Sequence, residues 1–527
     1  MKIVLTTRHL SFQLQWPNIL MKKNTLLIIF SGCYLWGSIP LICSDLSVII
    51  DKSRRETSQF ENSSRISLPF SETRPHSGVL FHRKPKPLPS GAVTHNWTSF
   101  LGPTHNAVSS ETKLLKAWPT SGPQLVWELT TGTGYASPAI QGGQLVHFYR
   151  QGNQEVVDCV NTETGKRYWK FRYQTQYRDR YGYNNGPRSS PVIDGDRVYT
   201  YGAEGKLYCL KLKTGKVDWM RHLSKEFHVS QEFFGVASTP LVEGNLLIVN
   251  VGAPGGPEVV ALNKRTGKLV WGAGDQWGPS YASPISGVVR GRKRVFVLAG
   301  GESRPPTGGL LSIDFSDGKI DFRFPWRSRS YSSVNASCPV IIGNQVFISA
   351  SYKTGAALLN ILPDGSHSLA WTAPHFGLHW NTPVHKDGYL YGFDGRNEPD
   401  ASLVCLDLKT GKEMWRTVLE WEEILTIREK QVKRTFSTYR GSLLWADGHF
   451  LCLGELGNLL WLDLSPQGHR TLSRTRLFAA RESWSPLVLS RGLLYVSQNR
   501  KDFLLGVPPR LLCYDLRANS SISPKKP

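Results

Sequence analysis

The chain has 527 residues, a length that usually suggests two or three domains. Its formal net charge is +22, and residues 1–95 contribute +7 of it, from 12 Lys and Arg against 5 Asp and Glu. A chain this basic could bind nucleic acid, anionic lipid or acidic polysaccharide. It contains no basic helix or nucleic-acid motif, so we exclude nucleic acid. We attribute most of the positive charge to solvated strand edges.

The first 44 residues indicate export. Two lysines after Met21 precede an apolar run from Leu26 to Ile42, which is the pattern of a secretory signal. We therefore interpret residues 1–20 as a mis-called N-terminal extension and residues 21–44 as a signal peptide. The apolar run is also close to the shortest helix that spans a bilayer, which leaves a retained membrane anchor as the alternative.

Two further segments outside the repeats have little periodicity. Residues 45–95 are rich in Ser, Arg and Pro, which predicts a disordered linker, and residues 518–527 are predicted to be a disordered tail. Phe30 to Cys33 resembles a lipoprotein cleavage box, with Phe where Leu is usual, so a lipid-anchored form also stays open. We expect a periplasmic protein, either free or tethered to the membrane at its N-terminus.

Residues 96–517 repeat a unit of four short strands. In the clearest copy, Arg188 to Leu223, Asp-Gly, Glu-Gly and Thr-Gly turns separate four strand-forming runs, because tight hairpin turns need the positive φ that glycine tolerates. The copies begin at Ser137-Pro138, Ser190-Pro191, Thr239-Pro240, Ser283-Pro284, Cys338-Pro339, Thr382-Pro383 and Ser485-Pro486. A degenerate copy without proline, Gly441 to Leu453, fills the double gap before the last of these.

Eight such units predict an all-β fold, an eight-bladed β-propeller of four-stranded repeats. The last unit ends without its fourth strand, whereas Pro123 to Leu129 forms a Trp-bearing strand with no blade before it. We therefore expect this N-terminal strand to complete the last blade and close the ring, which removes two exposed sheet edges.

Tryptophan and cysteine recur at fixed positions of the unit. We interpret the recurring tryptophans as structural residues that pack between blades: Trp127, Trp169, Trp219, Trp271, Trp371 and Trp415. Four cysteines share one third-strand position, too far apart around a ring to form disulfides: Cys159, Cys209, Cys405 and Cys513. No Cys-x-x-Cys pair occurs, so neither a structural zinc site nor a c-type haem is indicated.

The unit, Ser-Pro near its start and Thr-Gly followed by Trp near its end, resembles the pyrroloquinoline-quinone (PQQ) repeat. That repeat occurs in the eight-bladed quinoprotein alcohol dehydrogenase-like superfamily and in an outer-membrane assembly lipoprotein. The lead-in Trp97 to Pro103 and the segment Gly134 to Pro138 resemble exported PQQ-like propellers common in planctomycete-type bacteria, with Leu101 where Arg is usual. The resemblance covers about residues 96–517 and implies the fold and export, but only weakly an activity.

The segments that enter each first strand are expected to meet at one mouth of the channel. They carry aromatic, cationic and amide side chains that either contact a peptide, sugar chain or anionic ring, or plug the mouth and satisfy each other. The candidate ligand contacts are Tyr135, Asn185, Arg188, Trp277, Tyr281, His379, Trp380, Asn381, Arg440, Arg481, Glu482 and Trp484.

The sequence names no catalytic residue and no metal site. The carboxylates to consider for general-base work are Asp275, Glu302, Glu455 and Glu482, but none has a partner at a diagnostic spacing. His375 and His379 are four residues apart with Gly377 between them, so they are not expected on one face of a helix. The resemblance leaves PQQ with Ca²⁺ open, although the adjacent cysteines typical of quinoprotein alcohol dehydrogenases are absent.

These observations favour a monomeric binding or scaffolding module for an envelope protein or polysaccharide, with no required cofactor. The alternative is a PQQ-dependent alcohol or polyvinyl-alcohol dehydrogenase. A third hypothesis is an outer-membrane protein assembly scaffold.

Overall fold

The computed structural model describes residues 78–231, 233–396, 401–427 and 430–519. Every described residue belongs to one compact unit of the chain. Within the described ranges no helix is both long and apolar enough to cross a bilayer.

Several predicted segments lie outside the described residues. They are the extension at 1–20, the signal or anchor at 21–44, the linker up to residue 77 and the tail from residue 520. Residues 78–95, which the sequence assigned to the linker, are described and contain the strand β1 (Val79–Phe81), so regular structure begins before residue 96.

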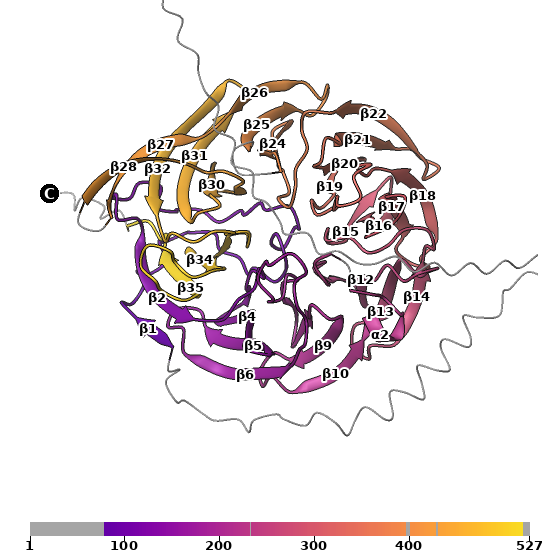
Figure 1. Ribbon diagram of the computed structural model, residues 1–527, viewed down its shortest axis with the longest axis horizontal. Helices are drawn as coiled ribbons and strands as arrows, with labels where there is room; N and C mark the ends of the chain where they lie inside the picture. Colours follow the sequence, from indigo (N-terminus) through magenta and orange to yellow (C-terminus); the bar gives the residue numbers. More distant parts are fainter. Residues whose placement is uncertain (1–77, 232, 397–400, 428–429, 520–527) are drawn as a thin grey trace, which may run out of the picture. The chain divides into compact units, whose positions relative to one another are not determined.

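Eight antiparallel sheets form a ring, so the described part of the chain is an eight-bladed β-propeller, which confirms the predicted fold class (Figure 1). Within each blade the first strand lies nearest the axis, and first strands of neighbouring blades contact each other.

Seven blades consist of four strands that are consecutive in the sequence. They are β3 (Ala139–Gln141), β4 (Gln144–Gln151), β5 (Gln154–Asn161) and β6 (Arg167–Gln174); β7 (Val192–Asp194), β8 (Arg197–Tyr201), β9 (Lys206–Lys211) and β10 (Val217–His222); β11 (Leu241–Glu243), β12 (Leu246–Asn250), β13 (Val259–Asn263) and β14 (Leu269–Ala273); β15 (Ile285–Val289), β16 (Arg292–Ala299), β17 (Gly309–Asp314) and β18 (Ile320–Pro325); β19 (Val340–Ile342), β20 (Gln345–Ala350), β21 (Gly355–Ile361) and β22 (His367–Ala373); β23 (Val384–Lys386), β24 (Tyr389–Asp394), β25 (Ser402–Asp407) and β26 (Glu413–Thr417); and β29 (Ser442–Ala446), β30 (His449–Leu453), β31 (Asn458–Ser465) and β32 (Gly468–Arg476).

The position of a strand in its blade explains its composition. All five residues of β8 are buried, because neighbouring blades cover both faces of the sheet, so this strand is apolar throughout except for Arg197 and Thr200. The outer strand β10 has no buried residue and carries charged and polar side chains. The turn between β9 and β10 places Gly215 at φ 67, in the left-handed region that favours glycine.

The recurring tryptophans join each blade to the next. The indole N–H of Trp169 in β6 donates to the carbonyl of Leu212 at 2.7 Å, just after β9 of the next blade. Equivalent bonds join Trp127 to Thr162, Trp219 to Lys264, Trp271 to Phe315, Trp371 to Leu408 and Trp415 to Ser465. The glycine of the next Thr-Gly turn lies against the indole, since a Cβ on Gly215 would approach Cε3 of Trp169 to 2.5 Å.

The residues before the repeat prolines form a belt around the axis. The backbone N–H of Ser137 donates to Oγ of Ser190 at 3.0 Å, and the N–H of Ser190 donates to Oγ1 of Thr239 at 3.0 Å. The same bond continues from Thr239 to Ser283 at 2.9 Å, from Ser283 to Sγ of Cys338 at 3.3 Å and from Cys338 to Thr382 at 3.1 Å. Each side chain thus satisfies a buried N–H of the preceding blade, which explains why the motif needs Ser, Thr or Cys before proline.

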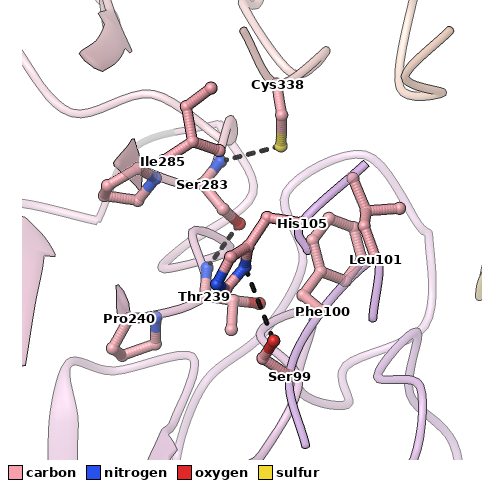
Figure 2. A pocket seen from close by; sticks show the side chains of 10 residues that line it. Ser99, Phe100, Leu101, His105, Thr239, Pro240, Ser283, Ile285 and Cys338 are labelled. Atoms are coloured by element: carbon pink, nitrogen blue, oxygen red, sulfur yellow. Dashed lines mark hydrogen bonds between the residues drawn. The ribbon is translucent and has the colours of Figure 1, made fainter. Parts of the chain in front are cut away.

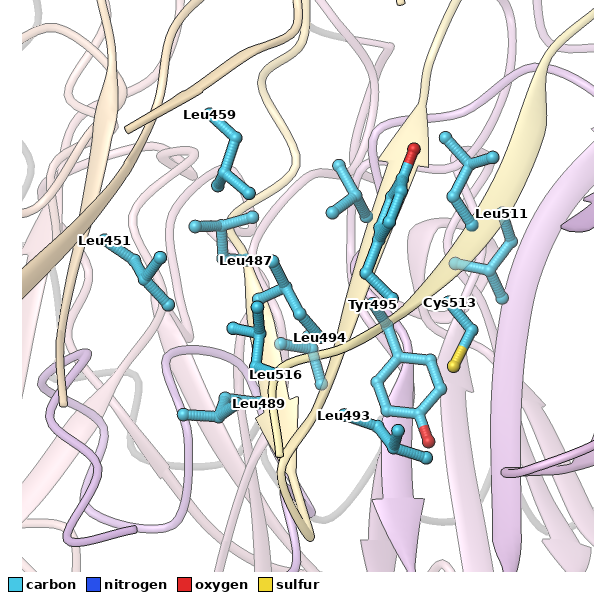
Figure 3. Close-up of a cluster of buried hydrophobic side chains, with 14 of the residues drawn as sticks. Leu451, Leu459, Leu487, Leu489, Leu493, Leu494, Tyr495, Leu511, Cys513 and Leu516 are labelled. Atoms are coloured by element: carbon cyan, nitrogen blue, oxygen red, sulfur yellow. The ribbon is translucent and has the colours of Figure 1, made fainter. Parts of the chain in front are cut away.

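The N-terminal strand β2 (Gln124–Thr130) completes the eighth blade, which confirms the predicted closure. It pairs with β35 (Arg510–Asp515), which pairs with β34 (Leu493–Gln498) and then β33 (Val488–Ser490), while β1 adds a fifth strand outside β2 (Figure 1). Figure 3 shows the leucines of this blade packing against Leu451 and Leu459 of the preceding one. Strands from the two ends of the chain therefore share one sheet and one core.

A hairpin absent from the prediction precedes the degenerate copy of the repeat. β27 (Glu420–Ile427) and β28 (Lys430–Ser437) form a two-stranded sheet at the outer rim, between the sixth and seventh blades (Figure 1). Its base packs on the seventh blade, with Arg474 of β32 4.6 Å from the Trp421 ring centre. The degenerate copy that follows it, β29 to β32, is a complete blade.

Candidate functional site

The lead-in to the propeller fills the channel from one end. Trp97 and Ile140 of β3 exchange two backbone hydrogen bonds of 2.9 and 2.7 Å, and the N–H of Ser109 donates to the carbonyl of Trp445 in β29 at 2.8 Å. Between these points the turn Ser99–His105 lies against the belt residues Thr239, Ser283 and Cys338 (Figure 2). The space left there is about 10 Å³, which is room for about one water molecule.

Leu101 sits in this turn at the position where the resembling proteins usually have Arg. It is buried at φ 59 and packs in one apolar cluster with Cys338, Val384 and Leu443. An apolar side chain therefore lies at this position, where the resembling proteins usually carry a charged one.

The other end of the channel is the mouth, where the loops from each fourth strand to the next first strand gather. Trp484 is its centre: its ring stacks on Tyr135 at 5.0 Å and lies 5.4 Å from Tyr183 and 6.1 Å from Trp380. Phe234 continues the contacts, 5.6 Å from Tyr183 and 5.4 Å from Tyr281. We call Tyr135, Tyr183, Arg188, Phe234, Trp380, Arg440 and Trp484 the mouth cluster.

Two arginines lie on the rings of the mouth cluster and are paired with acids. Arg188 lies 5.4 Å from the Tyr135 ring centre and donates to Asp179 at 2.6 Å. Arg440 lies 5.3 Å from the Trp484 ring centre and pairs with both oxygens of Glu455, a carboxylate that is fully buried. The Trp484 indole N–H also donates to Glu455, at 2.7 Å, so this carboxylate fixes both side chains.

Glu482 is the second carboxylate at the cluster. It accepts hydrogen bonds from the Tyr135 hydroxyl and from Arg500, the latter at 2.6 Å. Burial and the nearby Glu482 charge raise the pKa of Tyr135 well above its usual value, so its hydroxyl stays protonated and donates.

Loops from separated blades also meet across the mouth. Arg180, in the loop after β6, donates to Glu302 in the loop after β16 at 2.8 Å, and the Tyr331 hydroxyl donates to the same carboxylate. Mouth side chains from different blades therefore bind each other, which is the arrangement that the plugging alternative describes.

The predicted ligand contacts divide into two groups. Six of them lie in or directly against the mouth cluster as a connected set: Tyr135, Arg188, Trp380, Arg440, Glu482 and Trp484. Tyr281 reaches this set through Phe234, and His379 contacts Arg440 at 3.5 Å and the Tyr352 hydroxyl at 3.2 Å. Burial and then the Arg440 and Arg396 charges lower the pKa of His379 to about 3, so it is neutral.

The other predicted contacts lie elsewhere. Trp277 is buried in the core between the third and fourth blades, and Asn381 donates to the carbonyl of Phe393 at 3.2 Å. Asn185 accepts the backbone N–H of Asp179 at 2.7 Å and so shapes its own loop. Arg481 is exposed on the surface of the mouth face.

Among the four carboxylates considered for proton transfer, each has a cationic partner. Asp275 pairs with Arg323 at 3.1 Å, and Glu302, Glu455 and Glu482 are paired as described above. Within the described ranges, no three His, Cys, Asp or Glu side chains gather closely enough to hold a metal ion. His375 is exposed, whereas His379 lies in the mouth.

PQQ with Ca²⁺ would require a different arrangement of the mouth side chains. That group needs cations for its carboxylates, an open ring face to stack on and oxygen ligands for the metal. Here Arg188, Arg440 and Arg500 already bind acids, and Tyr135 covers a face of Trp484. In this arrangement the mouth side chains fit one another rather than a quinone.

Beside the mouth lies a larger space, which we call the polar cavity. It measures about 460 Å³ and lies between the second and third blades, at the ends of β6, β10 and β12. Its walls include Tyr177 and Tyr281, the amides Gln174, Gln176, Gln231 and Asn250, and the charged or titratable side chains Glu204, Lys206, His222 and Lys225. The short helix α2 (Leu223–Glu226) forms part of its rim.

Three polar atoms on the cavity wall are buried and have no partner within the described residues. They are Oδ1 of Asn250, Oγ of Ser238 and Nδ1 of His222, and Asn250 and Ser238 are only 3% and 2% exposed. The Asn250 amide N–H donates to Ser280 at 2.9 Å, which fixes the orientation of this side-chain amide. Buried polar atoms are nearly always hydrogen-bonded, so a polar ligand or water is expected here.

The charges of the cavity are largely compensated. Lys206 donates to Glu204 at 2.8 Å and to the carbonyl of Gln174 at 2.7 Å. Burial, followed by the Lys225 and Lys206 charges, lowers the pKa of His222 to about 4, so the imidazole is neutral. The wall therefore offers neutral donors and acceptors beside two tyrosine rings.

The sequence missed this cavity, because its residues come from five separate segments with no motif in common. Glu204 lies in a turn of the repeat, Lys206 begins β9, and Asn250 ends an ordinary apolar strand. Tyr281, a predicted mouth contact, was the only signal that pointed to it.

Comparison with known proteins shows the family. A family model described as outer membrane protein assembly factor BamB matches residues 153–417, from the turn after β4 to the end of β26. A search of the curated proteins found no match.

Two solved structures with TM-scores above 0.5 show the same fold at low identity. A europium-containing methanol dehydrogenase is 11% identical with a TM-score of 0.56 and covers 80% of this chain and 98% of its own. A quinohemoprotein alcohol dehydrogenase from Comamonas testosteroni is 13% identical with a TM-score of 0.54 and covers 81% of each chain. BamB from Moraxella catarrhalis is 14% identical with a TM-score of 0.48 and covers 75% of this chain and 98% of its own.

Proposed function

The chain belongs to the PQQ-like propeller family whose model is described as outer membrane protein assembly factor BamB, and on that premise we propose that it is an exported binding module of the cell envelope. Its ligand would be a polyhydroxylated molecule, a segment of an envelope polysaccharide, held in the polar cavity. The observation that carries this proposal is the set of three unpartnered polar atoms on the wall of a 460 Å³ space.

The chemistry of the wall supports a saccharide over an anion. Sugar hydroxyls both donate and accept, which suits Oδ1 of Asn250, Oγ of Ser238 and the neutral His222 together. The ring of Tyr281, which is half-buried on the wall, offers an apolar surface for the C–H side of a sugar ring. An acidic ligand would be repelled by the Glu204 carboxylate. Lys206 is already paired with Glu204, so it is not free to bind such a ligand.

The test is a glycan array of envelope and plant-type saccharides probed with the full chain, followed by calorimetric titration of the best glycan. Gln231→Trp, at the exposed rim of the cavity, and Asn250→Leu, in its wall, are expected to weaken binding at least tenfold. Gln467→Trp, the same change at an exposed turn of the seventh blade, is the control and should bind normally. Absence of any bound glycan, or binding insensitive to both cavity variants, would overturn the proposal.

A second candidate is a scaffold in outer-membrane protein assembly, and the family match over residues 153–417 favours it. Cross-linking the full chain in intact cells and identifying its partners tests this role, since a scaffold should capture components of that assembly apparatus. Titration of PQQ with Ca²⁺ tests the dehydrogenase alternative, and micromolar binding at one site would favour the enzyme.

A further inference from the structure

The loop between β34 and β35 exposes three consecutive apolar side chains. Phe503, Leu504 and Leu505 are 54%, 41% and 72% exposed. Among the described residues, no other run of three neighbouring large apolar side chains is exposed. Exposed apolar patches of this kind on a folded protein usually mark an interaction site.

The loop is held in this shape by a buried acid. Asp502 is 1% exposed, and its Oδ1 accepts the backbone N–H groups of Leu504 and Leu505, both at 2.8 Å. Its Oδ2 accepts the N–H of Ala479 at 2.9 Å, and the N–H of Phe503 donates to the carbonyl of Ala479 at 2.8 Å. The apolar tip is therefore a fixed, outward-pointing feature and does not fold back onto the core.

The surroundings of the tip are basic. Lys501 and Arg481 flank it and are exposed, and Arg178 is exposed on the adjoining loop. That loop also exposes 54% of Tyr181, and Arg500 joins the two loops through the carbonyl of Gly182 at 3.4 Å.

The acids of the same loops are neutralised by ion pairs. Glu482 pairs with Arg500 at 2.6 Å, Asp179 with Arg188 at 2.6 Å and Glu302 with Arg180 at 2.8 Å. The exposed charge that remains around the tip is positive.

We propose that this tip, Phe503 to Leu505 with Lys501 and Arg481 beside it, docks the mouth face of the propeller on an anionic lipid surface. A convex apolar tip enters the boundary between headgroups and acyl chains, while Lys and Arg at its base meet lipid phosphates. Tyr181, with an apolar ring and a polar hydroxyl, belongs at the same interface. This inference does not depend on the saccharide proposal, because it uses other residues.

The test is partition of the full chain into vesicles of 30% phosphatidylglycerol and 70% phosphatidylethanolamine, compared with phosphatidylcholine alone. Changing the tip to serine (Phe503→Ser, Leu504→Ser and Leu505→Ser together) is expected to lower binding to the anionic vesicles at least tenfold. Arg481→Glu with Lys501→Glu should lower it similarly, and the effect should shrink at high salt. The matched control removes three exposed apolar side chains from other blades: Val270→Ser, Val288→Ser and Leu369→Ser, at 52%, 64% and 50% exposure.

A local probe separates the tip from any anchoring by other parts of the chain. Leu505→p-benzoylphenylalanine should cross-link to lipid when the anionic vesicles are irradiated. Cross-links to a second copy or to a different protein, or vesicle binding that is equal in the tip variant and the control, would overturn the proposal.

Discussion

At Gly215 the repeat leaves no room for a side chain. Gly215→Ala would place a Cβ against Trp169 in addition to straining a φ of 67, and we expect a loss of about 2–4 kcal/mol in the free energy of unfolding. Gly195→Ala is the control, since it has a similar φ of 56 but open space around it, and should cost only about 1–2 kcal/mol. Denaturant unfolding of both variants measures the difference, and equal losses would mean that the indole contact contributes nothing.

The belt gives a second expectation for a single residue. Thr239→Val keeps the shape of the side chain but leaves the buried N–H of Ser190 without its acceptor, which we expect to cost about 1–3 kcal/mol. Thr239→Ser retains an acceptor oxygen and should lose less than half as much. The two variants are compared by urea unfolding. An equal cost for both would contradict the expectation, because the methyl group that Ser lacks would then contribute as much as the hydrogen bond that Val cannot accept.

Among the elements, the hairpin β27–β28 is attached to a propeller that is complete without it. Replacing residues 423–434 with a short Gly-Ser turn removes a partly exposed ion pair, Glu423 with Arg476, whose contribution is about 0–1 kcal/mol. We expect the melting temperature to fall by only a few degrees. Trp421→Ala should cost more, about 2–4 kcal/mol, since the indole is buried at the base of the hairpin in the core beside the seventh blade. Loss of the fold in the shortened chain would contradict the expectation that the propeller is stable without the hairpin.

Elements that belong to the repeat can be predicted from the sequence, whereas elements outside the repeat cannot. Ser-Pro starts, Thr-Gly turns and the following Trp predict blades because each of them makes a contact that recurs between blades, as Trp169 does with Leu212. The hairpin and β1 have no such recurring partner, so no repeat pattern marks them. The mouth cluster can be predicted from the sequence, because its residues lie in the segments that precede the first strands of the blades. The polar cavity cannot, because the lack of a partner for Asn250 depends on how the surrounding loops are arranged in space.

In the molecule as a whole, side chains occupy both ends of the channel, so a partner is expected to bind away from the propeller axis. The lead-in fills one end and the mouth cluster lies at the other. Among the described residues, the polar cavity and the apolar tip on the mouth face are two features open to a partner. The ring is closed by strands from its two ends, β2 and β35, and stabilises these loops as one body. A binding module can in this way present two chemically different surfaces from a single rigid scaffold.

The same rigid scaffold should be sensitive to acid through histidines buried in it. Burial lowers the pKa of His147 to about 4, partly offset by the Asp158 charge, against an ordinary value of 6.5 in the unfolded chain. Between pH 6.5 and 4, His147 is therefore protonated in the unfolded chain but neutral in the folded chain. The free energy of unfolding consequently falls as the pH falls, by about 1.4 kcal/mol per pH unit from this group. Above pH 6.5 both states are neutral and the contribution is constant. His147→Gln and His147→Phe should each remove that slope, whatever their cost at pH 7. Unfolding free energies at pH 7, 6 and 5 measure this slope. An unchanged pH dependence in both variants would mean that His147 does not contribute to the loss of stability in acid.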